Sequence, residues 1–182
     1  MSQKNLLVKQ QFSKVLGDLL LTKEFEDISA ADIIKQSGLS KATFYRHFHD
    51  KYELANWKFR TLMDGLKGVV VSGGETEDLH LEILRFIDRN RPEFKRLFKY
   101  TSQNSIREYY MQETFDWAHV HSKAEDKELF YRDYYTLIYC GNGFMAAIEE
   151  WLKSDDPISP EQLNSIISSN RTDVVRDLFV AR

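Results

Sequence analysis

Apolar residues recur along this chain three and four positions apart, the spacing that places them on one face of an α-helix. Residues 5–23 show the pattern first, with an apolar face of Leu7, Phe12, Val15, Leu16, Leu19 and Leu20. No segment alternates apolar and polar residues as a half-buried strand does, and the 182 residues include only three prolines. The pattern therefore predicts an all-α protein.

Further helices are expected from the same periodicity and from residues typical of helix ends. Gly73 and Gly74 mark the clearest break between them. The longest apolar face runs through residues 125–153 and is wide enough to contact both a core and a partner. The other expected helices lie at 30–36, 41–48, 51–66 and 77–89, from Pro92 onward, and at 103–121, 160–167 and 171–182.

The segment ISAADIIKQSGLSKATFYRHFHDK, residues 28–51, predicts two short helices joined by a tight turn. Ser29 and Ser40 stand at N-cap positions, where a hydroxyl can accept from early N–H groups that have no intrahelical partner. Gly38 supplies the unhindered backbone that such a turn requires. The arrangement is typical of a helix-turn-helix.

The second of these helices has an unusual distribution of side chains for a core element. Its one apolar stripe consists of Phe44 and Phe48, four residues apart, and polar side chains cover its other faces. A helix anchored by two aromatic rings and presenting hydrogen-bond donors elsewhere suits the major groove of DNA.

This segment resembles the N-terminal helix-turn-helix of the TetR family of bacterial transcriptional regulators. Ala42 stands where many members have glycine. The C-terminal part, with GNGFMAAIEEWL and the turn from Pro157 to Pro160, is similar to the C-terminal domain of a Firmicutes-type branch of that family. The residues that match the N-terminal pattern are Ile28, Ile33, Gly38, Leu39, Ser40, Lys41, Phe44, Tyr45, His47, Phe48 and Lys51.

The resemblance implies two domains. Residues 1–56 would form a three-helix DNA-binding domain of the helix-turn-helix type, and residues 57–182 a helical domain for regulation and dimerisation. We place the boundary near Trp57, within the helix expected from residue 51, because a rigid helix shared by both parts could transmit movement.

The resemblance also implies which side chains read DNA bases. Lys41, Ala42 and Thr43 would lie nearest the base edges in the major groove. Lys41 can donate to guanine O6 and N7, and the methyl group of Thr43 can contact thymine. These residues would set the sequence preference.

Phosphate contacts would come from neighbouring positions. Tyr45, His47 and Lys51 would reach the DNA backbone, which sets affinity and position but carries little sequence information. Arg46 is open between a backbone contact and a surface ion pair. Ser29 and Ser40 would cap their helices first, and their N-terminal amides could also hold a phosphate.

The distribution of charge agrees with this assignment. The whole chain carries a net charge of −3, yet residues 1–60 hold ten Lys or Arg against seven Asp or Glu. The remaining residues hold fifteen against twenty-one. Positive potential is thus concentrated in the part that would meet phosphates.

One helix-turn-helix reads few base pairs, so a two-fold homodimer on an operator of double-stranded DNA is expected. Phe144, Ile148, Trp151 and Leu152 are the candidate dimer contacts, and the alternative is that they pack inside one subunit.

For an effector, the aromatic-rich second half suggests a pocket. Its candidate lining is Trp117, Tyr139 and Asn142.

Other classes of protein find little support. The one cysteine, Cys140, excludes a disulfide framework. His119 and His121 are two apart and would point away from each other on a helix, so we expect no metal site. The sequence has no glycine-rich phosphate loop and no nucleophile motif, so we expect no cofactor and no catalytic residues. No apolar run approaches the ~20 residues of a membrane span, and the polar N-terminus is unlike a signal peptide, which predicts a cytoplasmic protein.

The sequence therefore predicts a dimeric regulator that represses transcription until a ligand binds. The alternative is a coactivator of the same fold that works through a protein partner. The effector, whether a small molecule or a protein, is not specified by the sequence.

Overall fold

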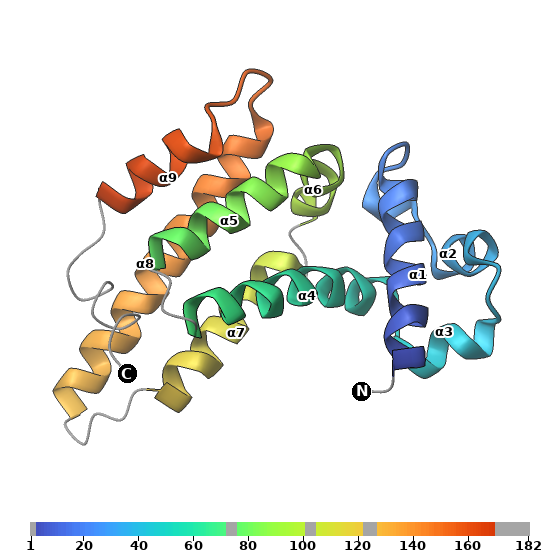
Figure 1. Ribbon diagram of the computed structural model, residues 1–182, viewed down its shortest axis with the longest axis horizontal. Helices are drawn as coiled ribbons and strands as arrows, with labels where there is room; N and C mark the ends of the chain where they lie inside the picture. The colour runs from blue at the N-terminus through green and yellow to red at the C-terminus, as the bar shows by residue number, and fades with distance from the viewer. Residues whose placement is uncertain (1–2, 72–75, 101–104, 122–126, 170–182) are drawn as a thin grey trace. The chain divides into compact units, whose positions relative to one another are not determined.

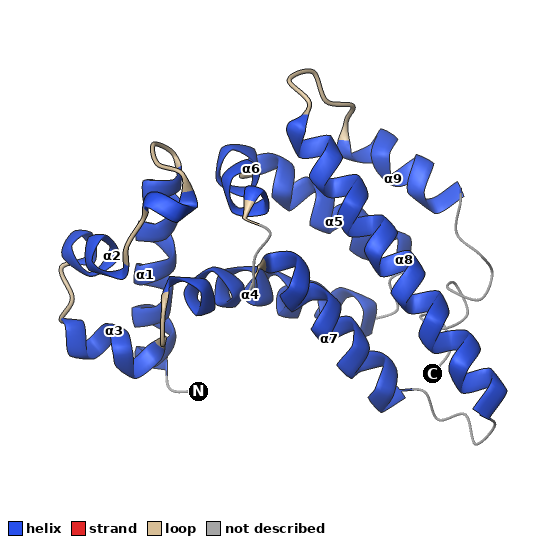
Figure 2. Ribbon diagram, turned by 180° about the vertical axis from the view of Figure 1, so that it is seen from behind, coloured by secondary structure: helices blue, strands red, loops and turns tan. Residues whose placement is uncertain are grey.

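The computed structural model describes residues 3–71, 76–100, 105–121 and 127–169. The secondary structure in these ranges is helical throughout, without a strand (Figures 1 and 2), which confirms the all-α prediction. The expected helix at 171–182 and the break at Gly73 and Gly74 lie outside the described residues. The elements are α1 (Gln3–Leu20), the 3₁₀ helix η1 (Phe25–Asp27), α2 (Ala30–Ser37), α3 (Lys41–His47), α4 (Lys51–Val71), α5 (Thr76–Arg89), α6 (Arg91–Lys99), α7 (Ile106–His121), α8 (Lys127–Lys153) and α9 (Pro160–Ser169).

These helices belong to two compact units. The first comprises the described residues of Met1–Leu62 and Arg91–Ile106, and the second those of Met63–Asn90 and Arg107–Arg182. The short helix α6 therefore packs with the N-terminal helices, although α5 precedes it and α7 follows it in the second unit. The division into domains at Trp57 stays a prediction, because close packing does not test which part folds independently.

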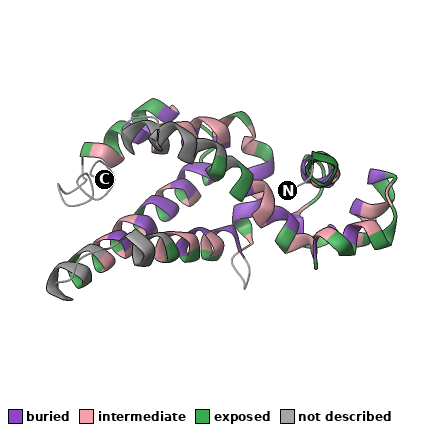
Figure 3. Cartoon of the chain, turned by 60° about the horizontal axis from the view of Figure 1, so that its bottom comes forward, coloured by how far each residue is buried: buried purple, intermediate pink, exposed green. Residues whose placement is uncertain are grey.

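The core of the first unit is aromatic. Phe12 of α1 meets the ring of Phe44 edge-on, with centroids 5.1 Å apart, and lies 6.3 Å from Phe48. All three rings are buried. Figure 3 shows how buried and exposed positions alternate along the helices. Edge-to-face pairs of this kind add about 0.5–1.5 kcal/mol each to the burial of apolar area. They fasten α3 to α1.

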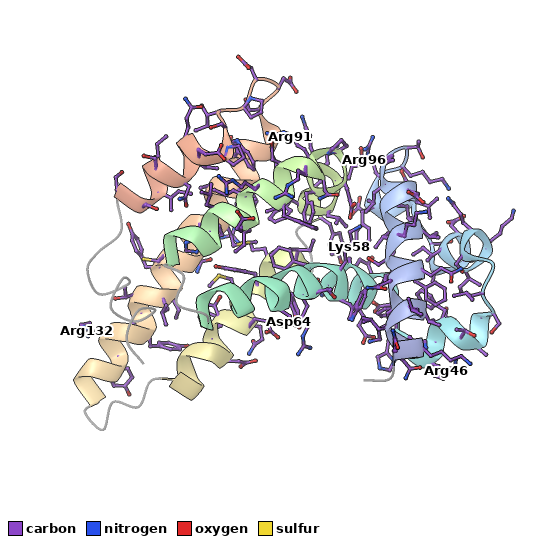
Figure 4. The ribbon with its side chains drawn as sticks, in the orientation of Figure 1. Arg46, Lys58, Asp64, Arg91, Arg96 and Arg132 are labelled. Atoms are coloured by element: carbon purple, nitrogen blue, oxygen red, sulfur yellow. The ribbon has the colours of Figure 1, made fainter. Side chains whose placement is uncertain are left out.

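A buried ion pair joins α4 and α6 inside the first unit (Figure 4 labels its cation, Lys58). Lys58 Nζ lies 2.7 Å from Glu93 Oε1, and the two side chains are 17% and 8% exposed. A Cβ atom on Gly17 of α1 would lie 3.0 Å from both Glu93 Oε2 and Lys58 Nζ, so the glycine gives the pair its room. Burial raises the pKa of Glu93, the Lys58 charge opposes that rise, and Asp18 adds to it.

The second unit is built around α8. Trp151 is buried near the end of that helix, and its indole Nε1 donates to the carbonyl oxygen of Ile158 at 2.7 Å, which fixes the turn into α9. α9 packs on α5, and Arg85 Nε donates to Glu161 Oε1 at 2.9 Å across that contact. Buried residues of this unit include Ile83, Leu84, Ile87, Leu137, Phe144, Met145, Ile148, Trp151 and Leu152.

The buried pair gives a first prediction about stability. In the Lys58→Met variant, Glu93 would be buried without its cation, which costs about 3 kcal/mol for a pair of this type. A double variant that also changes Glu93 to Leu should recover most of the loss, because no unpaired charge is then buried. Urea unfolding at neutral pH, followed by circular dichroism, measures both.

The matched control is Lys153→Met, which removes an ion pair with Glu150 whose side chains are 70% and 75% exposed. Exposed pairs contribute little to stability, so this variant should unfold with the wild type. Equal losses in the two single variants would contradict the role assigned to the buried pair.

Candidate nucleic-acid interface

The first helix of the motif, α2, begins at a complete capping box. Ser29 Oγ accepts from the Asp32 backbone N–H at 3.1 Å, and Asp32 Oδ2 accepts from the Ser29 backbone N–H at 2.9 Å. The Ser29 hydroxyl also donates to Asp32 Oδ2, at 2.6 Å, and this bond, with that from the Ser29 N–H, lowers the pKa of Asp32 more than the Lys23 charge does. The N-cap predicted at Ser29 is confirmed.

The turn between α2 and α3 depends on Gly38. Its φ of +68° lies in the left-handed region, which residues with a Cβ atom adopt only at a cost in free energy. Ser37 Oγ accepts from the Leu39 backbone N–H at 3.1 Å, and Gln11 Nε2 of α1 donates to the Ser37 carbonyl oxygen at 2.7 Å. The glycine turn is confirmed, and α1 holds it from outside.

The second helix of the motif, α3, is capped by Ser40, as predicted. Ser40 Oγ accepts from the Thr43 backbone N–H at 3.0 Å, and the two hydroxyl oxygens lie 2.9 Å apart. The hydroxyl of Thr43 is thus engaged inside the motif. Its methyl group remains for an apolar contact, the contact expected for a thymine methyl.

The outer side of α3 is polar and basic. Phe44 is buried, whereas Lys41, Ala42, Tyr45 and Arg46 are exposed (Figure 4 labels Arg46). The Tyr45 ring rests edge-on against Phe44 at 5.3 Å, and Lys41 Nζ lies 5.9 Å from the Tyr45 ring. About one and a half turns of α3 therefore expose the phenol of Tyr45 and the cations of Lys41 and Arg46. The buried ring of Phe44 anchors this part of the helix.

His47 lies at the end of α3 in a partly buried position. Its Nε2 atom is buried and makes no hydrogen bond within the described part of the chain. Burial lowers the pKa of His47, and the charges of Arg46 and Lys9 lower it further. A nearby phosphate would oppose those charges and favour the protonated ring.

Lys9 was missed by the sequence analysis. It belongs to α1, yet its Nζ lies 4.9 Å from the ring centre of Phe48 and 5.7 Å from that of Trp57, and its charge acts on His47. Its position in the sequence gives no signal of this, because the contact depends on how α1 packs on α3 and α4.

Two predicted phosphate contacts have other partners in the structure. Lys51 Nζ donates to the carbonyl oxygens of Phe25 at 2.7 Å, Glu26 at 3.0 Å and Ile28 at 2.7 Å. Ser29 directs both its N–H and its hydroxyl to the Asp32 carboxylate, which places a negative charge where a phosphate would sit. The DNA contacts of Lys51 and Ser29 stay predictions, and this geometry favours structural roles for both.

The candidate effector residues have different surroundings. Tyr139 is 79% exposed, so its ring does not line an enclosed pocket. Asn142 accepts from Arg107 Nη2 at 3.1 Å and donates to the Ile138 carbonyl oxygen at 2.9 Å. The side chain of Trp117 is outside the described residues. The pocket stays a prediction.

The candidate dimer contacts are buried in their own subunit. Phe144, Ile148, Trp151 and Leu152 face the core of the second unit, as in the alternative considered above, so they offer no surface to a partner. The exposed side of α8 follows a different set of positions. Its members are Tyr131 (53% exposed), Tyr135 (64%) and Tyr139 (79%), followed by the exposed Gly143 and Ala146.

Within the described ranges, no group of three or more His, Cys, Asp or Glu side chains could hold a metal ion. None of the described helices combines the length and the apolar character that crossing a bilayer requires.

Known proteins resemble both parts of the chain. Residues 18–56 match the profile described as "Bacterial regulatory proteins, tetR family", and residues 74–172 match "Transcriptional regulator C-terminal region". A curated relative is the HTH-type dhaKLM operon transcriptional activator DhaS of Lactococcus lactis, 24% identical over 96 residues. That alignment covers 53% of this chain and 51% of the relative, so the match spans about half of the relative's length.

Solved structures resemble the chain over nearly its full length. The dihydroxyacetone kinase operon activator DhaS has a TM-score of 0.60 at 17% identity, covering 95% of this chain and 97% of that one. A TetR transcriptional regulator from Streptococcus agalactiae gives 0.61 at 16%, with 92% and 94% covered. A tetR-family regulator from Streptomyces coelicolor gives 0.52 at 17%, with 93% and 80% covered. At these identities the likeness establishes a shared fold.

The lowered pKa of His47 predicts a pH dependence of stability. Between that lowered value and the ordinary value of about 6.5, the unfolded chain binds a proton that the folded chain does not. The resulting loss of stability is absent above about pH 6.5 and grows as the pH falls through this window. His47→Gln should therefore lose less stability than the wild type on acidification to about pH 5.5.

Chemical denaturation at a series of pH values measures this difference. His49→Gln is the control, because His49 is exposed and lies two residues away. Parallel curves for the wild type and His47→Gln would show that His47 does not titrate in this way.

Proposed function

Because the chain belongs to the TetR family of bacterial transcriptional regulators, we propose that it binds a palindromic operator as a homodimer and represses transcription until an effector binds. The family comprises DNA-binding transcription factors and not enzymes, and the match to its C-terminal region alone covers more than half of the chain. The exposed basic side of α3 is the observation that carries the proposal. Such a protein would act in the cytoplasm, where bacterial DNA is located.

Base reading is assigned to the start of α3. Lys41 and Ala42 are exposed there, and the methyl group of Thr43 is available because its hydroxyl is bound to Ser40. Lys41 would donate to guanine, while Thr43 would favour thymine. A change at these positions should alter which sequence is preferred.

Phosphate binding is assigned to the exposed side chains that follow. Tyr45 and Arg46 are exposed on α3, and the charges of Arg46 and of Lys9 in α1 both act on the partly buried His47. Ser40 adds an exposed hydroxyl at the cap. These groups would set affinity and its dependence on salt, because each neutralised phosphate releases counterions.

A homodimer would place two such surfaces on one operator. We assign the interface to the exposed side of α8, which carries three tyrosines four residues apart and then Gly143 and Ala146. Tyrosine offers a large apolar ring with a polar end, and small residues let a partner helix approach closely. Two-fold symmetry would set the half-sites about 34–36 Å apart, one turn of DNA.

Effector control would act on the spacing of the two reading surfaces. A ligand that binds the DNA-incompetent arrangement more tightly shifts the population away from the operator. The second candidate is activation through a protein partner. It is supported by the curated relative, which is named an operon transcriptional activator.

The test of DNA binding is selection of fragments from random duplex DNA by the purified protein at two salt concentrations. An enriched palindrome is the expected result for a dimer that reads an operator. Transcription from a promoter carrying that palindrome would then fall with repression and rise with activation. Binding that is weak, unselective and abolished by salt would count against operator reading.

The assignment of the dimer interface predicts the behaviour of Gly143→Arg. No heavy atom lies within 4 Å of a Cβ added at Gly143, so the subunit accommodates the change. Arginine is also a better helix former than glycine by roughly 0.5–1 kcal/mol. Two like charges facing each other across a two-fold axis should convert the dimer to monomer without loss of helix content.

Sedimentation equilibrium measures this shift. Gln112→Arg places the same side chain at an exposed position of α7 and serves as the control. If the Gly143→Arg protein stays dimeric, the exposed side of α8 is not the dimer interface.

A further inference from the structure

We propose that Lys51 is a positioning residue that fastens together the two ends of the helix-turn-helix, and that it does not contact DNA phosphate. The inference rests on the proposed function, because positioning matters only if α3 reads DNA. It changes the role that the family resemblance implies for Lys51.

The first support is the geometry of the ammonium group. Lys51 Nζ has three carbonyl oxygens within hydrogen-bond distance, those of Phe25 (2.7 Å), Glu26 (3.0 Å) and Ile28 (2.7 Å). A lysine ammonium has three N–H donors and no acceptor, so the three contacts use its whole capacity. No donor remains for a phosphate in this arrangement.

The second support is the need of the carbonyl groups themselves. They belong to η1 and to the residue that ends it, where carbonyls lack partners from a following turn. The Phe25 carbonyl oxygen also accepts from the Ile28 backbone N–H, at 3.3 Å. A partly buried carbonyl without a donor is costly. Lys51 therefore adds a short hydrogen bond to each of the three carbonyls.

The third support is the unfavourable place in which the cation is held. Lys51 is the first residue of α4, and the N-terminus of a helix disfavours positive charge. The rings of Phe25 and Tyr52 face the ammonium, with centroids 4.8 Å and 5.3 Å from Nζ, and add attraction. Burial lowers the pKa of Lys51, and the negative charges of Glu26 and Asp27 oppose that shift.

The topology explains why this contact would govern DNA reading. Residues 25–28 come directly before α2, and Lys51 comes directly after α3. The contact therefore closes residues 29–50, the whole reading motif, into a loop held at its base. Phe25 and Tyr52 reinforce that base with ring centroids 5.4 Å apart.

Tyr100 covers the base of the motif, and a second contact holds the other end of α2. Tyr100, just after α6, stacks on Tyr52 at 4.9 Å and lies 5.7 Å from the Phe25 ring, which limits the access of water. At the other end of α2, Gln11 donates to the Ser37 carbonyl oxygen. The motif is thus held at its base from α4 and at its turn from α1.

The experiment compares Lys51→Met and Lys51→Arg with the wild type in the full-length protein. Hydrogen exchange without DNA reports on residues 25–37, and binding to a fixed duplex of selected sequence is measured over a range of salt. We expect faster exchange in this segment for both variants and roughly tenfold weaker binding, the scale of one lost charged hydrogen bond. The slope of log affinity against log salt should equal that of the wild type.

Arginine is the informative replacement. Its planar guanidinium keeps the charge but cannot bring three N–H groups to one point, so it should not restore the wild-type properties. A phosphate contact would behave in the opposite way. Lys51→Met would then lower the slope by about 0.9 with unchanged exchange, and Lys51→Arg would restore binding, which would overturn the proposal.

A control separates positioning from general loss of stability. Leu97→Ala removes a buried side chain of α6 in the same unit, at a residue that is not a partner of Lys51. Its faster exchange should spread over the unit and leave binding intact where the protein is folded. If Lys51→Met behaves in the same way, the positioning role is wrong. If the wild type itself binds no DNA, the proposed function fails, while exchange still tests the fastening.

Discussion

The burial of Phe12 against Phe44 and Phe48 is the contact on which the proposed DNA-reading surface depends. α3 has only seven residues, too few to be stable as an isolated helix, so its conformation must come from packing. The two phenylalanines anchor one side of it in the core of the first unit. The opposite side is thereby turned outward, and the polar residues there need no internal partner. An apolar anchor thus makes a polar surface possible.

Polar contacts then set the details that ring packing leaves open. Rings tolerate small rotations, whereas the bonds from Gln11 to the Ser37 carbonyl and from Lys51 to three carbonyls hold the backbone at defined points. α6 adds its own contacts to the same unit. Glu93 pairs with Lys58 beside Gly17, and Arg96 donates to the Leu20 carbonyl oxygen at 2.7 Å. In the chain, α6 lies between α5 and α7 of the second unit. The two units are therefore linked covalently at both ends of α6.

The two sides of α8 differ in burial. One side, with Phe144 and Ile148, is buried in the subunit. The other carries exposed tyrosines and then small residues. The wide apolar face in the sequence predicted a helix that serves both a core and a partner, but the residues assigned to the partner are buried in their own subunit. Apolar periodicity gives the width of such a face and not which part of it the subunit covers.

The sequence by itself determined the helices, the caps at Ser29 and Ser40, the turn at Gly38 and the family, because these depend on residues close together in the chain. Tertiary structure alone decided the partners of Lys51 and the contribution of Lys9. The three carbonyl oxygens that Lys51 binds lie 23 to 26 residues away in the chain, and no local pattern encodes a contact between residues so far apart. The placement of α6 with the N-terminal helices has the same origin, since packing and not chain order decides which helices share a core.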